Sequence, residues 1–202
     1  MQTSHLLLLM VRSAQEVLIV ATGQTQAEQP PQIDLASKIR TIPDFPVPGI
    51  LFRDITTLLK DGQAFSYAID QLTDRIRDLK PDKIVAIESR GFIFGAPIAY
   101  KLGIGFVPVR KLGKLPAETV VAEYELEYGT NTVEMHADAI SPGERVVIVD
   151  DLLATGGTTR ATIELVERLD GDIVGLAFLI ELTELGAREY LEGFNIITLL
   201  RF

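Results

Sequence analysis

One segment, residues 146–159, limits the possible folds of this chain more than any other; it reads Val-Val-Ile-Val-Asp-Asp-Leu-Leu-Ala-Thr-Gly-Gly-Thr-Thr. Its β-branched beginning is typical of a buried strand, and a helical pattern follows it to about Leu169. The glycines of the connecting loop let the backbone come close to a ligand, and amides at the start of a helix attract anions. The segment therefore predicts a strand, a phosphate-binding loop and a helix in succession.

Strand and helix patterns alternate through the rest of residues 33–202. Strands are predicted at 83–88, 105–110, 145–150, 172–182 and 196–200, and helices at 33–39, 65–79, 91–102 and 184–191. Strands at 120–126 and 132–136 predict a β-excursion around 128–131, and the prolines of 41–49 predict a shaped loop instead of a helix. Such alternation is typical of an α/β fold with a parallel sheet between two layers of helices.

Residues 1–32 differ in character from the rest of the chain. A short stretch of mixed apolar and polar residues is followed by 22–32, which is rich in Thr, Gln and Pro. We expect an N-terminal extension and linker at 1–32 and one domain at 33–202. The extension has no apolar run long enough to span a membrane, and it lacks the positive charges that open a secretory signal. We therefore expect a cytoplasmic protein with no membrane partner.

The composition excludes several kinds of site. Lys and Arg total 19 against 28 Asp and Glu, a net charge of −9, so we expect no nucleic-acid partner, and an anionic ligand needs a local group of cations. The chain has no cysteine, and its two histidines, His5 and His136, have no partners at metal-ligand spacing. We therefore expect no metal site made of protein side chains. The loop also lacks the lysine of a nucleoside triphosphatase.

Two carboxylates, Asp150 and Asp151, stand directly before the predicted phosphate-binding loop. Beside a phosphate they would repel it. They fit the site if they accept hydrogen bonds from the vicinal hydroxyl groups of a ribose whose 5′-phosphate lies in the loop. The alternative is a pair of aspartates at a strand end that caps the next helix.

The segment 146–159 resembles the signature for 5-phosphoribosyl 1-diphosphate (PRPP) in the type I phosphoribosyltransferase family. Four further segments resemble its adenine phosphoribosyltransferases: Pro-Asp-Phe-Pro-Val-Pro-Gly-Ile-Leu-Phe-Arg-Asp-Ile-Thr at 43–56, Glu-Ser-Arg-Gly-Phe-Ile-Phe-Gly at 88–95, Arg-Lys-Leu-Gly-Lys-Leu-Pro at 110–116 and Glu-Leu-Glu-Tyr-Gly at 125–129. They occur in the family's order and cover about 33–202. The resemblance implies the type I phosphoribosyltransferase fold, a twisted, mostly parallel α/β sheet flanked by helices, with a hood and a β-excursion loop.

The resemblance also implies a reaction and its partners. Adenine and PRPP would give AMP and diphosphate in purine salvage, with Mg²⁺ bound with PRPP, and the enzyme would be a homodimer. Asp150 and Asp151 would bind the ribose hydroxyls. The 5′-phosphate would be held by Ala154, Thr155, Gly156, Gly157 and Thr158.

The diphosphate of PRPP would lie on the turn after the strand 83–88. Ser89 and Arg90 would meet it there, and the family typically closes this turn with a cis peptide, here between Glu88 and Ser89. Glu88 stands where aspartate is common, which keeps the charge. Further positive charge would come from Arg110, Lys111 and Lys114. The Arg110 position typically reaches the active site of the other subunit.

The base and the chemistry are assigned by the same motifs. Leu51 and Arg53 would read the adenine edge with backbone groups, while Phe52 and Leu152 hold its faces. Arg90 and Glu127 would be catalytic, Glu127 by handling the purine proton, and Tyr128 would lie beside the diphosphate as the loop closes. Each of these residues also has a simpler interpretation if the motif is ignored. Phe52 would then be a core aromatic residue, Glu127 would lie on a solvated strand face, and 110–114 would be a solvated basic loop.

Two other functions are compatible with a PRPP loop. One is a transferase for another purine base such as hypoxanthine, guanine or xanthine. The other is a non-catalytic regulator that senses PRPP. The net charge of −9, the absence of a DNA-binding helix-turn-helix pattern and the presence of Glu127 and Arg90 argue against the regulator.

Overall fold

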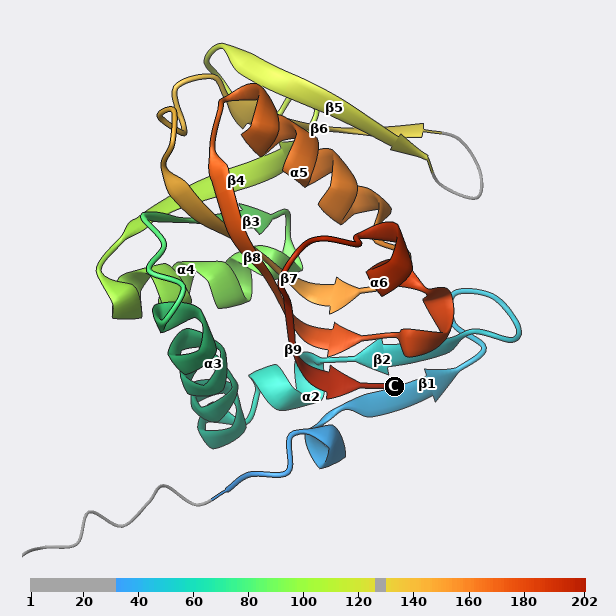
Figure 1. Cartoon of the computed structure of the whole chain (residues 1–202). Coiled ribbons are helices and arrows are strands. Elements are labelled where there is room, and N and C mark those ends of the chain that lie inside the picture. The colour runs from blue at the N-terminus through green and yellow to red at the C-terminus, as the bar shows by residue number, and fades with distance from the viewer. Residues whose placement is uncertain (1–31, 126–129) are drawn as a thin grey trace, which may run out of the picture. The chain divides into compact units, whose positions relative to one another are not determined.

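The central sheet of this computed structural model, which describes residues 32–125 and 130–202, has the strand order β5-β6-β4-β3-β7-β8-β9 (Figure 1). Five strands of this sheet pair with one another in parallel. In sheet order they are β4 (Gly105–Lys111), β3 (Lys83–Ile87), β7 (Arg145–Leu153), β8 (Asp172–Glu181) and β9 (Ile196–Arg201). The excursion, β5 (Thr119–Glu125) and β6 (Thr130–His136), continues the sheet with antiparallel pairing. The predicted mostly parallel sheet is confirmed.

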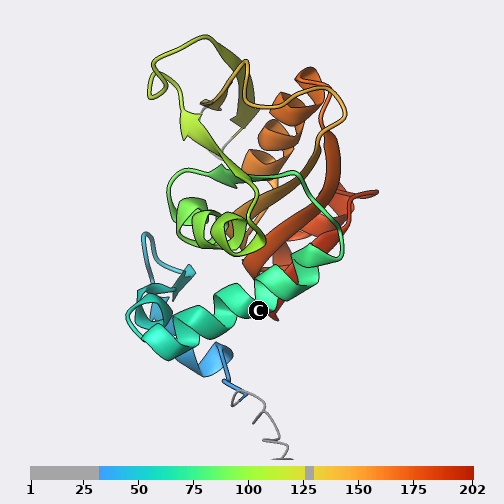
Figure 2. The same cartoon turned by 90° about the vertical axis from the view of Figure 1, so that its left-hand side faces the viewer.

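Helices cover both faces of the sheet, as Figures 1 and 2 show. Successive side chains of a strand point to opposite faces, so Ile84 and Ala86 of β3 belong to one core and Val85 and Ile87 to the other. The first core includes buried side chains of two helices, α3 (Gly62–Arg77) and α4 (Arg90–Leu102). The second includes those of α5 (Gly157–Arg168). Because β3 is buried on both faces, its sequence is continuously apolar after Lys83.

The long helices begin and end at the signals that the sequence carries. Asp61 caps α3 by accepting hydrogen bonds from the amides of Gln63 and Ala64. Gly103 ends α4 in the left-handed conformation, with φ of 69°. Among the described residues, no helix has the length and apolar character needed to cross a membrane.

Two predicted helices are shorter than expected. The stretch 33–39 contains only the 3₁₀ turn η1 (Ala36–Lys38), and 184–191 is divided into η2 (Thr183–Leu185) and α6 (Ala187–Tyr190). Gly186 causes the division, because its left-handed φ of 68° ends the first turn. Both segments were predicted from apolar spacing, which does not reveal such a break.

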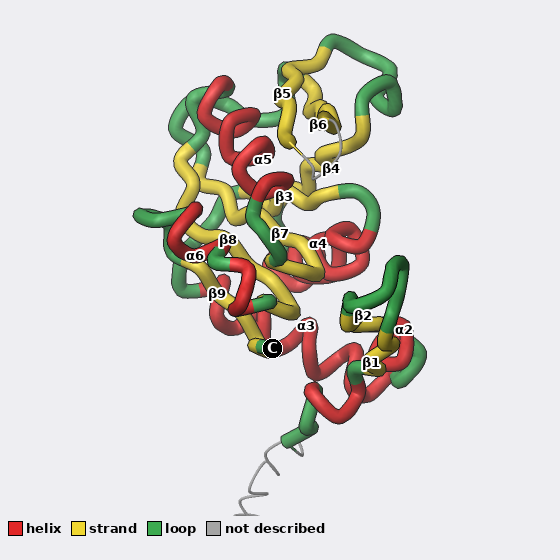
Figure 3. Tube along the Cα trace, turned by 90° about the vertical axis from the view of Figure 1, so that its right-hand side faces the viewer, coloured by secondary structure: helices red, strands yellow, loops and turns green. Residues whose placement is uncertain are grey.

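The predicted loop 41–49 begins as a strand, which corrects the prediction. β1 (Arg40–Pro43) pairs with β2 (Leu51–Asp54) in a separate antiparallel hairpin, followed by α2 (Thr56–Leu59) (Figure 3). A proline is tolerated at the end of an edge strand, so Pro43 does not prevent the pairing. The Phe45–Pro46 bond is cis in the connecting turn. We call residues 40–54 the hood.

An ion pair closes the open end of the hood. Arg40 donates to the buried carboxylate of Asp54, which also accepts a hydrogen bond from the Thr56 amide at 2.9 Å. The Arg40 hydrogen bond is the main reason that the pKa of Asp54 falls to about 2. Asp54 is therefore ionised across the physiological pH range, and the two strands are held in register by a permanent charge pair.

Candidate active site

A cavity of about 360 Å³ lies at the carboxyl ends of β3 and β7, where open α/β sheets bind ligands. It combines residues from strands, turns and helix starts that are far apart in the sequence. Its lining residues are Ile87, Glu88, Ser89, Arg90, Lys111, Tyr124, Asp150, Asp151 and Thr158. The structure therefore brings together six predicted site residues: Ser89, Arg90, Lys111, Asp150, Asp151 and Thr158.

Arg90 and Asp151 both line this cavity, and their side chains form an ion pair. Arg90 Nε lies 2.5 Å from Asp151 Oδ2, and the Arg90 side chain is 51% exposed while that of Asp151 is 6% exposed. Burial lowers the pKa of Arg90, but the charge and the hydrogen bond of Asp151, together with the charge of Asp150, outweigh it and raise that pKa above its ordinary value. The Arg90 guanidinium is therefore a permanent positive charge at the cavity, and the buried Asp151 carboxylate holds it in place.

Asp150 has a different environment from its neighbour. Burial raises the pKa of Asp150 well above its ordinary value, and the nearby charge of Asp151 raises it further. One Asp150 oxygen accepts a hydrogen bond from the Asp151 amide at 2.8 Å. A carboxyl group of this kind loses its proton more readily once a hydroxyl donor or a cation arrives, so Asp150 is suited to a ligand that brings either.

The start of α4 approaches β7 so closely that position 91 must be glycine. A Cβ atom on Gly91 would lie 2.8 Å from the carbonyl oxygen of Val149 and 3.0 Å from Asp150 Oδ1. Gly91 stands in the Glu-Ser-Arg-Gly turn, but the sequence alone predicts no role for it. Its backbone sets the distance between the Arg90 turn and the two aspartates.

We therefore expect Gly91→Ala to displace Asp150 and weaken substrate binding. Forcing a methyl group into a packed site costs about 1–3 kcal/mol of folding free energy, so the melting temperature should fall and the KM for PRPP should rise severalfold. The control is Gly62→Ala at the start of α3, where a Cβ atom meets nothing within 4 Å. Calorimetry and initial rates of both variants check the prediction, and equal behaviour of the two would contradict it.

The Glu88–Ser89 peptide bond is cis, which confirms the geometry that the resemblance implied for this turn. The Glu88 carboxylate accepts hydrogen bonds from Arg110, at 2.9 Å and 3.3 Å, and from the Lys111 amide at 3.1 Å. The Arg110 hydrogen bond is the main reason that the pKa of Glu88 is lowered. Glu88 thus joins the turn after β3 to the end of β4, a role that no local pattern indicates.

The basic segment 110–114 is positioned by a second carboxylate. Glu134 of β6 is 3% exposed and accepts hydrogen bonds from the amides of Lys114 and Leu115, at 2.7 Å and 2.8 Å. Burial raises the pKa of Glu134, but these two amides, the Gly113 amide and the Thr119 hydroxyl together outweigh it and hold the pKa below its ordinary value. Arg110 donates to the Lys114 carbonyl at 3.1 Å, so its guanidinium is engaged within this chain. Neither Arg110 nor Lys114 lines the cavity.

The predicted phosphate-binding loop forms the start of α5. Gly156 precedes the helix with a left-handed φ of 89°, and its carbonyl accepts a hydrogen bond from the Arg160 amide at 2.8 Å. A second cavity, of about 460 Å³, borders this loop at Thr155 and Gly157, and Tyr124 lines both cavities. Its other lining residues are Glu123, Arg160, Ala161, Glu164 and Tyr190. Ala154 is half-buried before the turn.

The predicted base-binding residues belong to two strands, β2 and β7. Leu51, Phe52 and Arg53 are the first three residues of β2 in the hood, and Leu152 is half-buried in β7 against the core that contains α3 and α4. Phe52 packs edge-on against Phe45, with ring centroids 5.1 Å apart. None of the four lines either of these cavities. Glu127 and Tyr128 lie outside the described residues, so their predicted roles stay predictions.

Comparison with known proteins decides the family. Residues 56–196 match the phosphoribosyl transferase domain family. An adenine phosphoribosyltransferase of Desulfitobacterium hafniense is 58% identical over 170 residues, which are 84% of this chain and 98% of that protein. The chain belongs to the adenine phosphoribosyltransferase family.

Solved members of the adenine phosphoribosyltransferase family have the same fold. The crystal structure from Thermoanaerobacter pseudethanolicus is 58% identical, with a TM-score of 0.81 over 83% of this chain and 98% of that one. The structure from Saccharomyces cerevisiae, complexed with an imino-altritol bisphosphate and adenine, is 42% identical, with a TM-score of 0.77 over 81% and 95%. The predicted family and type I fold are confirmed.

Proposed function

We propose that this chain is a pentosyltransferase of purine salvage that transfers the phosphoribosyl group of PRPP to adenine, releasing diphosphate and giving AMP. One observation carries the proposal: Ser89, Arg90, Asp150, Asp151 and Thr158 line a single cavity at the carboxyl edge of the sheet, in a chain 58% identical to an adenine phosphoribosyltransferase. The cavity contains both a fixed cation and carboxylates, as a substrate with phosphates and a ribose requires.

PRPP binds along the edge formed by β3, β7 and the start of α5. The 5′-phosphate lies against Ala154, Thr155, Gly156, Gly157 and Thr158, where the amides at the start of a 12-residue helix favour negative charge. The ribose hydroxyls donate to Asp150 and Asp151. This contact supplies the hydroxyl donors that favour the ionised form of Asp150.

The diphosphate lies beside the cis turn, against Ser89, Arg90 and Lys111. As the bond from C1′ to the diphosphate oxygen breaks and the bond to the purine nitrogen forms, negative charge grows on the diphosphate. Arg90 meets this charge without reorganising, because the buried Asp151 already holds its guanidinium. The proton leaving the purine passes to Glu127, and Tyr128 covers the diphosphate.

The donor set fits a magnesium ion that is held with PRPP. Mg²⁺ prefers carboxylate and phosphate oxygens and keeps several waters, and two carboxylates line the cavity beside the ribose position. Within residues 32–125 and 130–202, no cluster of three or more His, Cys, Asp or Glu could hold a metal by itself. When bound, the ion would neutralise part of the diphosphate charge. Asp150 and Asp151 would hold the ribose hydroxyls beside it.

The adenine lies under the hood, with its edge on the backbone of Leu51 and Arg53 and its faces between Phe52 and Leu152. Leu51 is 57% exposed, and Phe45, Val47 and Ile50 of the same hairpin are also exposed. Apolar side chains left in solvent beside a substrate site favour a flat, apolar ligand. Backbone readout explains why the site needs no Asn or Gln at this position.

The active enzyme is a cytoplasmic homodimer. Arg110 reaches the other subunit's active site in that dimer after it releases Glu88 and the Lys114 carbonyl of its own chain. Ile93 and Tyr100 lie two turns apart on one face of α4 and are 37% and 87% exposed, and Phe106 of the adjacent β4 is 36% exposed. Large apolar side chains on one exposed face support a contact with a second copy. A sedimentation experiment that finds only monomers at assay concentration would refute this part.

Incubation of the full chain with PRPP, Mg²⁺ and one purine base at a time tests the function. We expect AMP from adenine, with hypoxanthine, guanine and xanthine at least a hundredfold slower. Efficient use of another base would assign the enzyme to that base. Binding of PRPP without any nucleotide product would favour the PRPP-sensing regulator.

Deletion of residues 1–32 is expected to leave the specific activity within a few-fold of the full chain. No motif of the family occurs there, and the described elements all lie in Ile33–Phe202. Initial rates of both proteins at saturating substrates check this. A truncated protein that folds but is inactive would show that the extension contributes to the site.

A further inference from the structure

The side chain of Arg53 turns away from the predicted base edge and toward the last residue of the sequence. Its guanidinium carbon lies 4.2 Å from the centre of the Phe202 ring, and Nη1 donates to Thr41 Oγ1 at 2.6 Å. Its Nε is buried and has no hydrogen-bond acceptor among the described residues. The face of the Phe202 ring is therefore a main partner for this charge.

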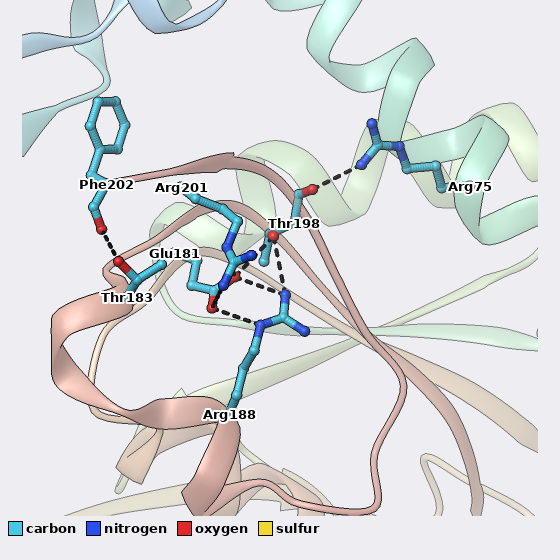
Figure 4. Close-up of polar contacts among 7 residues, drawn as sticks. All are labelled: Arg75, Glu181, Thr183, Arg188, Thr198, Arg201 and Phe202. Carbon is cyan, nitrogen blue, oxygen red and sulfur yellow. Dashed lines mark hydrogen bonds and ion pairs between the residues drawn. The ribbon is translucent and has the colours of Figure 1, made fainter.

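The Phe202 ring is held in place by the backbone beneath it. The Phe202 amide donates to the Glu181 carbonyl at 2.9 Å, and the Phe202 carbonyl accepts from the Thr183 amide and hydroxyl, both at 2.8 Å. Figure 4 shows Thr183 beside Phe202 and the Glu181 carboxylate among its cationic partners. The residue is thus tied at both backbone groups to the end of β8.

The end of β8 is in turn joined to the strand that contains the two aspartates. Glu181 pairs with Leu153 in the β7–β8 ladder, and the Leu182 amide donates to the Leu153 carbonyl at 2.9 Å. Leu153 is two residues after Asp151. A short chain of contacts therefore runs from the hood to the ribose-binding strand through the Phe202 ring.

We propose that Phe202 is a positioning residue for the purine base, because its ring fixes Arg53 and with it the part of β2 that reads the base. The proposal rests on the proposed function. The β1–β2 pairing and the Arg40–Asp54 ion pair set the register of the hood, but a two-stranded hairpin is marginally stable by itself. An anchor from Phe202, directly after β9, on the pair of Thr41 with Arg53 therefore limits how far β2 can move.

Phe202→Leu tests this with little change in apolar volume. Losing a cation–π contact should raise the KM for adenine about 3- to 10-fold, while the KM for PRPP changes less than twofold. Phe202→Tyr, which keeps the ring face, should restore the KM for adenine. Phe194→Leu is the matched control. Phe194 is a half-buried aromatic residue that packs against the second core, which includes α5. Its replacement should leave the ratio of the two KM values unchanged.

A double-mutant cycle with Arg53→Met identifies the route of the effect. Arg53→Met keeps the β2 backbone, so if Phe202 acts through the guanidinium, adding Phe202→Leu to it should change the KM for adenine no further. Equal rises in both KM values, or an undiminished effect in the Arg53→Met background, would overturn the proposal. Failure of the wild-type chain to form AMP would instead overturn the proposed function.

Discussion

Replacing Asp150 and Asp151 together by asparagine should weaken PRPP binding at least about a hundredfold while the fold is kept. Hydrogen bonds to a charged group contribute about 1.5–3 kcal/mol each, and the double variant removes both ionised acceptors at the ribose. It also removes the anchor of Arg90, whose Nε lies 2.5 Å from Asp151, so the diphosphate loses a fixed cation. Titration calorimetry with PRPP and Mg²⁺ measures the loss.

The control for this variant has the same change of net charge at a distance from the cavity. Asp70→Asn with Asp74→Asn removes two carboxylates from α3, where Asp70 forms a surface ion pair with Lys101 at 2.6 Å. The control should bind PRPP as the wild-type chain does. If the Asp150 and Asp151 variant retains its melting temperature and also its PRPP affinity, the ribose assignment is wrong.

The sheet was predictable because its strands are defined by short-range pattern. Residues 146–149 are buried on both faces and read as a continuous apolar run, which needs no knowledge of partners. The hood strands were not predictable in this way. β1 and β2 contain a proline, charged residues and exposed side chains, and the Arg40–Asp54 pair that supports them joins residues 14 positions apart.

The site was predictable only in part for a related reason. Motifs place Ser89, Arg90, Asp150 and Asp151 in order along the chain, and the parallel sheet brings them to one edge. Other contacts depend on the folded geometry, such as Gly91 against β7, or Arg53 against a ring 149 positions later in the printed sequence. No periodicity or local motif contains that information.

The second large effect is expected at Glu181, a buried carboxylate at the end of β8. It is 3% exposed and accepts hydrogen bonds from Arg188, at 2.7 Å and 2.8 Å, and from Thr198 at 3.1 Å, with Arg201 at 3.3 Å (Figure 4). Removing one partner of a buried ion pair costs about 3–5 kcal/mol. Because Arg188 and Arg201 are partly solvated, we expect Glu181→Gln to lower the free energy of unfolding by about 2–3 kcal/mol.

The pH dependence of this loss separates the charge from the packing. The hydrogen bonds of Arg188 lower the pKa of Glu181 in the folded chain, so its contribution is present at neutral pH and disappears as the pH falls below the ordinary glutamate range. Urea unfolding should therefore show a large difference between wild type and Glu181→Gln at pH 7 and a smaller one near pH 3. Glu164→Gln is the matched control, because Glu164 pairs with Arg168 on the surface of α5 and its loss should cost less than about 0.5 kcal/mol. A difference for Glu181→Gln that is the same at both pH values would show that shape, and not the ionised carboxylate, holds the end of β8 beneath Phe202.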